Sequence, residues 1–141
     1  RKGMDLVVNG AGTAVRSRLQ LENIAMAGKT GTAQVRRIEG AQRGQSGAWK
    51  YRDHGLFVCF APVDQPRYGA AVVIEHGLGG ARAAAPIAKD VLTFIYDREQ
   101  AMKSLEALEA GWGGNIEQRM AAKYAAFQGQ PADPPPLDPT A

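Results

Sequence analysis

Two short apolar runs predict the centre of a β-sheet. Residues 55–61, GLFVCFA, are apolar throughout after the first glycine, and Pro62 ends the run. A run of this length is typical of a central strand that is covered on both faces. Residues 68–75, YGAAVVIE, form a second run of strand length. The link between the runs, PVDQPR, is too short for a crossover, so the two strands are predicted to pair antiparallel.

Apolar residues at helical spacing flank these strands. Near the start of the chain they are Met4, Val7, Val8 and Ala11. After the second strand, residues 83–99 predict an amphipathic helix that returns onto the sheet, with Pro86 tolerated in its first turn. The stripe expected to face the sheet consists of Ile87, Val91, Leu92 and Ile95.

The helical pattern continues as far as Gly111, through Met102, Leu105 and Leu108. Asn115, followed three positions later by Gln118, predicts a capped start for a further helix, which carries Ile116, Met120 and Phe127. The proline-rich end of the chain predicts an extended, largely disordered tail. Three segments are therefore expected: part of a folded domain over 1–98, a helical extension over 99–128 and the tail over 129–141.

The composition is that of an ordinary soluble domain. The 141 residues are 45% hydrophobic and 22% charged, which allows one modest core. No run approaches the roughly 18 apolar residues of a membrane span, and no basic-then-apolar signal peptide precedes the fold, so any membrane anchor is expected outside this chain. The single cysteine, Cys59, excludes an internal disulfide and is expected to be a small buried apolar residue.

The net charge of +3 is mild and does not indicate a nucleic-acid partner. Most of the positive excess lies in one stretch, at Arg36, Arg37, Arg43, Lys50 and Arg52. Basic surfaces that bind nucleic acid usually interleave aromatic residues along the face, and only Trp49 and Tyr51 lie nearby. This stretch is predicted to be a solvated loop.

Residues 25–35, AMAGKTGTAQV, concentrate a lysine, hydroxyls and glycines between apolar flanks. A phosphate-binding loop of the G-x-x-x-x-G-K-[ST] type fails here, because Asn23 stands where its first glycine belongs and the sequence continues as a strand. The second interpretation is a turn in which the lysine has no role, and only the glycines support it. The third interpretation is an exposed strand edge that receives an acyl substrate, within a strand predicted over Gln20–Val35.

A strand edge of this composition suits a peptide with an anionic end. Extended backbone can pair with a peptide by strand addition, and Gly31 keeps side-chain bulk away from its approach. Alternation places Lys29 and Gly31 on one face and Thr30 and Thr32 on the other, with the face of the cleft left open. Lysine supplies positive potential beside a carboxylate and threonine supplies hydroxyl donors. The Thr32 amide is a candidate for half of an oxyanion hole.

Three ordered segments resemble a known family. They are residues 3–15, GMDLVVNGAGTAV, residues 27–34, AGKTGTAQ, and residues 53–88, which contain DHGLFVCFAP and VVIEHG. K-T-G is a motif of penicillin-binding proteins and related β-lactamases. The succession resembles the end of the transpeptidase domain of a class B penicillin-binding protein, and within that class the elongation type, penicillin-binding protein 2.

This resemblance implies an α+β fold, part of a β-lactamase/transpeptidase-like architecture with an antiparallel sheet flanked by helices, of which the chain is expected to hold only the C-terminal portion. It implies acyl transfer from a peptidoglycan stem peptide ending in D-Ala-D-Ala, through a serine acyl-enzyme that β-lactam antibiotics inhibit, with no cofactor and no metal. By position, Lys29, Thr30 and Gly31 form the K-T-G triplet on the strand that lines the cleft, and Thr32 follows in carboxylate and oxyanion contacts.

Catalysis in this family also needs an S-x-x-K nucleophile and an S-x-N element, and this chain holds neither. Three positions after Ser17, Ser46 and Ser104 stand Gln20, Trp49 and Ala107. No serine therefore has a lysine one helical turn away. An S-x-N element needs an asparagine two positions after a serine, and at these positions the chain has Leu19, Ala48 and Glu106. The chain is expected to carry a substrate-binding wall and to be inactive alone, with the nucleophile in an upstream part of the same protein.

The resemblance further implies a parent protein at the periplasmic face of the bacterial inner membrane, anchored by a segment outside this chain. It also implies a glycosyltransferase of the elongation machinery as a partner. Two alternatives stay open. A non-catalytic β-lactam-sensing or degenerate relative keeps the pocket without turnover, and an NTP-binding module predicts thermal stabilisation by nucleotide.

Both histidines of the chain lie near the predicted sheet. His54 matches a recurrent position of the elongation type and is expected to be satisfied by a neighbouring loop. Glu75 and His76 stand at a strand exit and are expected to be structural or solvated. Two histidines so placed do not form a metal motif.

Overall fold

A computed structural model describes residues 1–35 and 48–128 of the chain. The chain divides into two compact units, Arg1–Ala101 and Met102–Ala141. The expected disordered tail and the basic residues Arg36, Arg37 and Arg43 lie outside the described residues.

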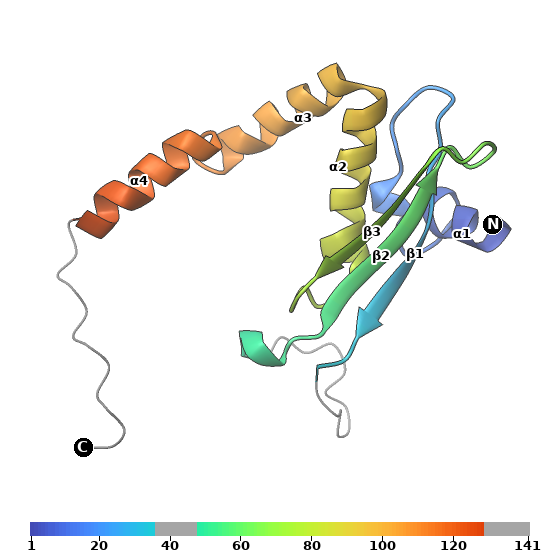
Figure 1. Ribbon diagram of the computed structural model, residues 1–141, viewed down its shortest axis with the longest axis horizontal. Helices are drawn as coiled ribbons and strands as arrows, with labels where there is room; N and C mark the ends of the chain where they lie inside the picture. The colour runs from blue at the N-terminus through green and yellow to red at the C-terminus, as the bar shows by residue number, and fades with distance from the viewer. Residues whose placement is uncertain (36–47, 129–141) are drawn as a thin grey trace. The chain divides into compact units, whose positions relative to one another are not determined.

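The first unit is built on a three-stranded antiparallel sheet in the order β1-β2-β3 (Figure 1). The strands are β1 (Ala27–Ala33), β2 (His54–Ala61) and β3 (Tyr68–Ile74). The predicted antiparallel pair, with residues 55–61 in the centre, is confirmed.

The strand predicted over Gln20–Val35 is wrong in its first part. Residues 21–24 form a turn closed by a single bridge between Leu21 and Ile24, and residues 20, 25 and 26 are in no strand. Asn23 takes the left-handed conformation there, with φ of 59°, which asparagine tolerates better than most residues. The chain therefore reverses before it enters β1.

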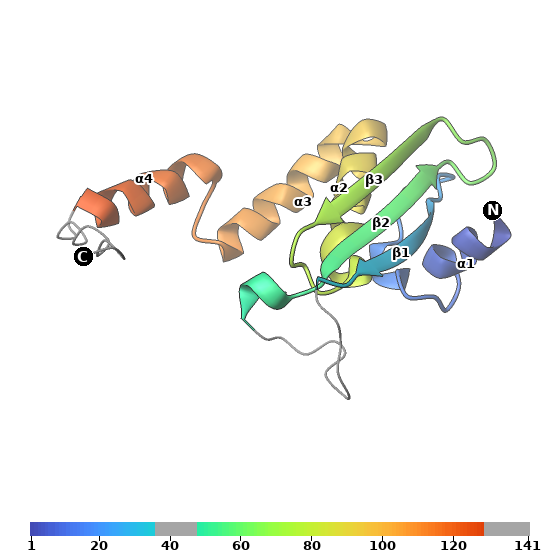
Figure 2. The same cartoon turned by 60° about the horizontal axis from the view of Figure 1, so that its bottom comes forward.

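Helices cover one face of the sheet (Figure 2). They are α1 (Lys2–Asn9), the 3₁₀ turn η1 (Val15–Ser17), the π-helical turn η3 (Gly80–Ala84) and α2 (Ala85–Tyr96). A further 3₁₀ turn, η2 (Trp49–Tyr51), precedes β2. The α+β class predicted from the sequence, an antiparallel sheet with flanking helices, is confirmed.

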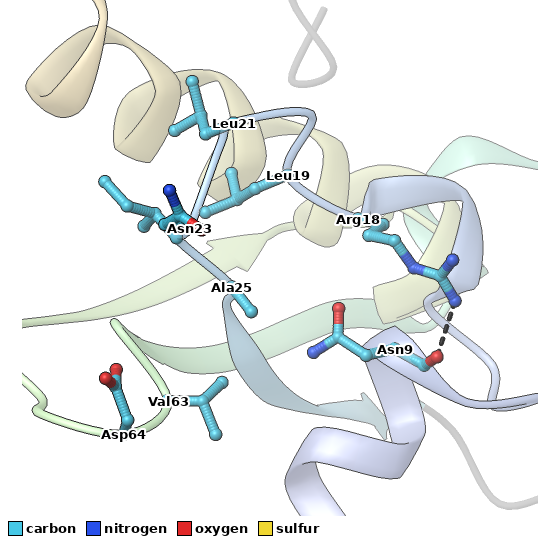
Figure 3. Close-up of a pocket in the computed structure, with 9 residues that line it drawn as sticks. Asn9, Arg18, Leu19, Leu21, Asn23, Ala25, Val63 and Asp64 are labelled. Atoms are coloured by element: carbon cyan, nitrogen blue, oxygen red, sulfur yellow. Dashed lines mark hydrogen bonds between the residues drawn. The ribbon is translucent and has the colours of Figure 1, made fainter.

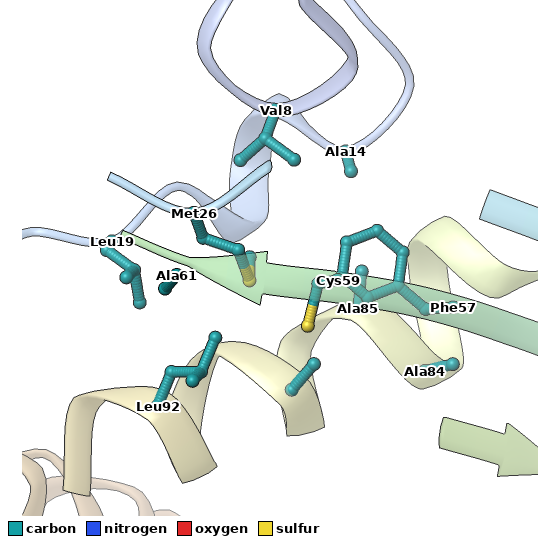
Figure 4. Packing of buried hydrophobic residues seen from close by; sticks show 11 residues of the cluster. Val8, Ala14, Leu19, Met26, Phe57, Cys59, Ala61, Ala84, Ala85 and Leu92 are labelled. Carbon is teal, nitrogen blue, oxygen red and sulfur yellow. The ribbon is translucent and has the colours of Figure 1, made fainter. Parts of the chain in front are cut away.

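The core lies between β2 and α2, with α1 closing one side (Figure 4). Side chains alternate along β2, so Phe57, Cys59 and Ala61 are buried on the helical face. Cys59 is buried as predicted, and this burial raises the pKa of its thiol above the ordinary value. The thiol is therefore held neutral and unreactive.

The side of α2 that faces the sheet differs from the predicted stripe. Leu92 is buried as expected, but Ile87, Val91 and Ile95 are exposed, and the other buried residues of the helix are Ala85, Ala88 and Thr93. Small alanines allow the helix backbone to approach the sheet closely, which the larger side chains would prevent. The helix is amphipathic as predicted, with its buried face rotated from the predicted one.

The opposite face of the sheet is largely open in the described residues. Val58 on β2 is 46% exposed and Val73 on β3 is 60% exposed, while Leu56 and Phe60 are half-buried. The prediction that β2 is covered on both faces is wrong within residues 1–35 and 48–128, because α1, η1, η3 and α2 pack on the other side.

The second unit contains most of α3 (Arg98–Gly111), which crosses the boundary between the units, and all of α4 (Ile116–Gln128). Neither helix buries a residue among those described. Asn115 Oδ1 accepts a hydrogen bond from the Gln118 amide at 3.0 Å, and Gln118 Oε1 accepts one from the Asn115 amide at 2.9 Å. The predicted cap of this helix is confirmed. No helix in the part of the chain described is long and apolar enough to span a bilayer.

Asn115→Ala is expected to fray the start of α4. Loss of a capping side chain costs about 1 kcal/mol, and α4 buries nothing that would compensate. Amide hydrogen exchange in the first turn of α4 should accelerate roughly fivefold. Asn115→Ser keeps a capping oxygen and should exchange like the wild type. Equal exchange in the alanine variant would show that the cap does not stabilise this helix.

Candidate active site

The lysine-bearing segment forms strand β1, at an edge of the described sheet. Its register with β2 pairs Lys29 with Val58 and Gly31 with Leu56. Paired residues share a face, so Lys29 and Gly31 lie on the open face of the sheet. The alternation predicted from the sequence is confirmed, and the register settles which face carries the lysine.

Lys29 and Gly31 shape this open surface in different ways. The Lys29 side chain is exposed, and its Nζ donates a hydrogen bond to the Thr30 carbonyl oxygen at 2.7 Å, so the charge lies against the strand. A Cβ at Gly31 would lie 3.3 Å from Leu56 Cβ. The glycine therefore leaves a low backbone surface next to a localised positive charge.

Thr30, on the helical face, has a partner that the sequence analysis missed. Its Oγ1 lies 3.0 Å from Thr13 Oγ1, in the segment between α1 and η1. This segment folds back tightly, because a Cβ at Gly12 would lie 2.3 Å from Val7 Cα. The glycines of GAGTAV were a signal for such a close approach.

The start of β1 is fastened to α1 by Asn9. Asn9 Nδ2 donates to the carbonyl oxygen of Met26 at 2.9 Å and to Asp5 Oδ1 at 2.7 Å. Arg18 Nη2 donates to the Asn9 carbonyl oxygen at 2.6 Å. Met26 is fully buried, so this network fixes the point at which the chain enters the strand.

Near the other end of β1, the His54 ring has a hydrogen-bond partner in a neighbouring loop, as expected. His54 Nδ1 accepts a hydrogen bond from the His76 amide at 2.9 Å. His76 Nδ1 lies 2.9 Å from the Arg52 carbonyl oxygen, to which it can only donate. Glu75 is exposed and His76 is half-buried.

Gly80 is a second residue that the sequence analysis missed. A Cβ at this position would lie 1.9 Å from the Leu56 carbonyl oxygen and 2.8 Å from the Gly31 carbonyl oxygen. The backbone at the start of η3 therefore rests directly on β2 and on the glycine of the lysine-bearing strand. Gly79 and Gly80 stand shortly after the second strand in the sequence, a pattern typical of a break, but the pattern does not point to this contact.

A hollow of about 420 Å³ lies near the entrance to β1, away from the Lys29 surface (Figure 3). The Arg18–Asn9 hydrogen bond crosses its wall. It is lined by Asn9, Arg18, Leu19, Leu21, Asn23, Ile24, Ala25, Val63 and Asp64. None of the predicted site residues Lys29, Thr30, Gly31 and Thr32 lines it.

The succession of elements around β1 agrees with one protein family. The family model described as the penicillin-binding protein transpeptidase domain matches residues 1–93. The chain belongs to the penicillin-binding protein transpeptidase family. The family predicted from the three sequence segments, including the penicillin-binding protein 2 type, is confirmed.

Similar proteins of this family include two named peptidoglycan D,D-transpeptidase MrdA. The one from Acinetobacter baumannii is 42% identical over 93 residues, which cover 64% of this chain and 13% of the relative. The one from Haemophilus influenzae is 34% identical over 100 residues, 70% of this chain and 15% of the relative. The chain therefore spans about one seventh of the length of these transpeptidases.

Solved structures of penicillin-binding protein 2 share the fold. The Pseudomonas aeruginosa protein, in complex with WCK 5153, aligns with a TM-score of 0.53 at 38% identity, over 71% of this chain and 19% of that one. The Helicobacter pylori protein, in complex with MreC, aligns with a TM-score of 0.55 at 31% identity, over 71% of this chain and 17% of that one.

Proposed function

We propose that β1 is the substrate-binding wall of a peptidoglycan D,D-transpeptidase, and that it holds a stem peptide ending in D-Ala-D-Ala. The observation that carries this is the extended K-T-G strand at a sheet edge, with Lys29 exposed on the open face. An edge strand offers unpaired backbone groups to an extended peptide.

The residues of β1 have different roles in substrate binding. The Lys29 ammonium attracts the terminal carboxylate from the open face, and the Thr30 and Thr32 hydroxyls, which lie on the other face of the strand, donate hydrogen bonds to the substrate at the strand edge. The Thr32 amide supplies one donor to the oxyanion that forms as the peptide carbonyl is attacked, a contribution of about 2.7–4 kcal/mol to the transition state. Gly31 leaves room for the peptide backbone to approach.

The reaction proceeds through a serine that this chain does not supply. The serine oxygen attacks the carbonyl of the penultimate D-Ala, the terminal D-Ala leaves with a proton, and an acceptor amine then releases the acyl group. β-Lactams occupy the same wall and acylate the same serine. The chain alone, without an S-x-x-K or S-x-N element, binds but does not form the acyl-enzyme.

The whole protein works at the periplasmic face of the inner membrane, with an anchor in another part of the polypeptide. Its partners are the upstream part of the same protein and a glycosyltransferase of the elongation machinery. The similarity to MrdA proteins supports this setting. The Helicobacter pylori relative, solved with MreC, supports an assembly with proteins of cell elongation.

Labelling of the full-length protein with fluorescent penicillin tests the proposal. The acylated serine should map by peptide mass spectrometry to a segment upstream of Arg1, and the protein should release D-Ala from a stem pentapeptide. Acylation of Ser17, Ser46 or Ser104 would overturn the assignment of the nucleophile. Acylation without release of D-Ala would identify the alternative, a β-lactam sensor without turnover.

Thr13→Val is expected to slow acylation by penicillin, because the Thr30 side chain loses a hydrogen bond that supports it. The variant removes the hydroxyl that lies 3.0 Å from Thr30 Oγ1 and frees the Thr30 side chain to rotate. One neutral hydrogen bond contributes about 0.5–1.5 kcal/mol, so the rate constant for penicillin acylation should fall roughly twofold to tenfold. Thr13→Ser keeps the hydroxyl and should match the wild type. A full rate in the valine variant would show that this contact does not orient Thr30.

A further inference from the structure

The segment from His76 to Gly80, between β3 and η3, is held across the end of the sheet by hydrogen bonds. The His76 amide donates to His54 Nδ1 at 2.9 Å, and the Leu78 amide donates to the Asp53 carbonyl oxygen at 2.8 Å. His76 and Leu78 both adopt the left-handed conformation, with φ of 56° and 68°. Non-glycine residues take this conformation at a cost, and these bonds help to maintain the segment's shape.

The same segment touches the strand that carries the K-T-G triplet. A Cβ at Gly55 would lie 2.8 Å from the Gly79 carbonyl oxygen, and one at Gly80 would lie 2.8 Å from the Gly31 carbonyl oxygen. A displacement of the His76–Gly80 segment is therefore transmitted to Gly31 by direct backbone contact. A second link exists beside it, because Asp53 Oδ1 accepts the Val35 amide at 3.3 Å just after β1.

We propose that His54 is a positioning residue for β1: its Nδ1 holds the His76–Gly80 segment, and the segment holds Gly31 in register for the substrate. The inference rests on the proposed function, since it assumes that β1 binds the acyl substrate. His54 itself pairs with Ala33 at the last ladder position of β1, so it acts from the end of the strand and not on the reacting atoms.

This positioning depends on the protonation of His54. Nδ1 accepts a hydrogen bond, so it carries no proton while the segment is held. Protonation converts Nδ1 to a donor facing the His76 amide, and the bond is lost. His76 behaves in the opposite way, because its Nδ1 donates to the Arg52 carbonyl oxygen and a protonated ring can still donate. Acidification therefore weakens the hold through His54, because a protonated ring cannot accept the His76 amide.

Other groups on the segments packed here also carry charge or titrate. They are Arg52 and Asp53 beside His54 in the chain, Glu75 and His76 at the exit of β3, Lys29 on β1 and Arg82 on η3. The centre of the His76 ring lies 4.2 Å from the centre of the Trp49 ring and 4.9 Å from that of the His54 ring. A test must therefore separate His54 from these neighbours.

The full-length protein carrying His54→Asn or His54→Leu provides this separation. Asparagine Oδ1 can accept the His76 amide and does not titrate near neutral pH, whereas leucine offers no acceptor. The rate constant for penicillin acylation would be measured from pH 5.5 to 8 for both variants, the wild type and Glu75→Gln, an exposed neighbour used as the control. The midpoint of thermal unfolding would be recorded at each pH to correct for loss of folded protein.

We expect the ratio of wild-type to His54→Asn rates to be near one at pH 8 and to fall roughly threefold to tenfold by pH 5.5, as for one lost hydrogen bond. His54→Leu should be slow at every pH, and Glu75→Gln should follow the wild type. If both His54 variants follow the wild type throughout, the positioning role is wrong. If the wild type itself is never acylated, the proposed function fails first, and this inference with it.

Discussion

Lys29→Met in the full-length protein is expected to lose most of its acylation by penicillin. The substitution removes the ammonium from the open face of β1 and keeps an unbranched side chain that is one atom shorter. A hydrogen bond to a charged group contributes about 1.5–3 kcal/mol, so the second-order rate constant for acylation should fall roughly tenfold to 150-fold. Stopped-flow or gel-based measurement with fluorescent penicillin would report this loss.

Stability should not change, which separates binding from folding. Lys29 is exposed and its Nζ bonds only to the neighbouring Thr30 carbonyl oxygen in the described structure, so the thermal midpoint should match the wild type. Lys2→Met removes an exposed lysine from α1 and should leave both quantities unchanged. Lys29→Arg keeps the charge with a different donor geometry and should retain part of the rate. Acylation of Lys29→Met at the wild-type rate would remove β1 from the substrate site.

Local pattern was sufficient to predict the elements whose cause is local. Residues 55–61 and 68–74 are strands because nearly every residue in them is apolar or β-branched and a short link joins them. The start of α4 was predicted because the reciprocal Asn115–Gln118 bonds involve residues three positions apart. Elements of this kind carry their own start and stop signals.

Burial depends on what packs against an element, and there the pattern failed. Hydrophobicity ranks Ile87 and Val91 above Ala85 and Ala88, yet the alanines face the sheet because small residues allow the helix to approach it closely. The two-sided apolarity of β2 suggested two covered faces, whereas the described residues cover one.

The features of the candidate site also divide into those that local sequence pattern predicts and those that depend on contacts between distant residues. The extended conformation of the K-T-G segment and the alternation of its faces follow from composition and strand geometry. The contacts that support the segment do not, because they join distant positions: Thr13 to Thr30 are 17 positions apart, and His54 to His76 are 22. The sequence therefore pointed to the residues that are proposed to contact substrate. It did not point to most of the residues that hold these substrate-contacting residues in place.

Gly80 is the supporting residue on which the site depends most, because it leaves no space for a side chain. An alanine Cβ there would lie 1.9 Å from the Leu56 carbonyl oxygen and 2.8 Å from the Gly31 carbonyl oxygen. Both contacts are to backbone of paired strands, which cannot rotate away as a flexible side chain would. The start of η3 must therefore move off the sheet, and the neighbouring core residues Ala84 and Ala85 must move with it.

Gly80→Ala should consequently lose about 2–4 kcal/mol of stability, at the upper end for an overpacked site. The thermal midpoint of the transpeptidase domain should fall by roughly 5–15 °C, and acylation should fall even below that temperature, because Gly31 is displaced. Gly79→Ala is the control in the same loop. Its Cβ would meet nothing within 4 Å, and its φ of −173° is extended backbone that any residue adopts. This variant should be as stable as the wild type. Equal midpoints for the two alanine variants would mean that η3 does not rest on the K-T-G strand as described.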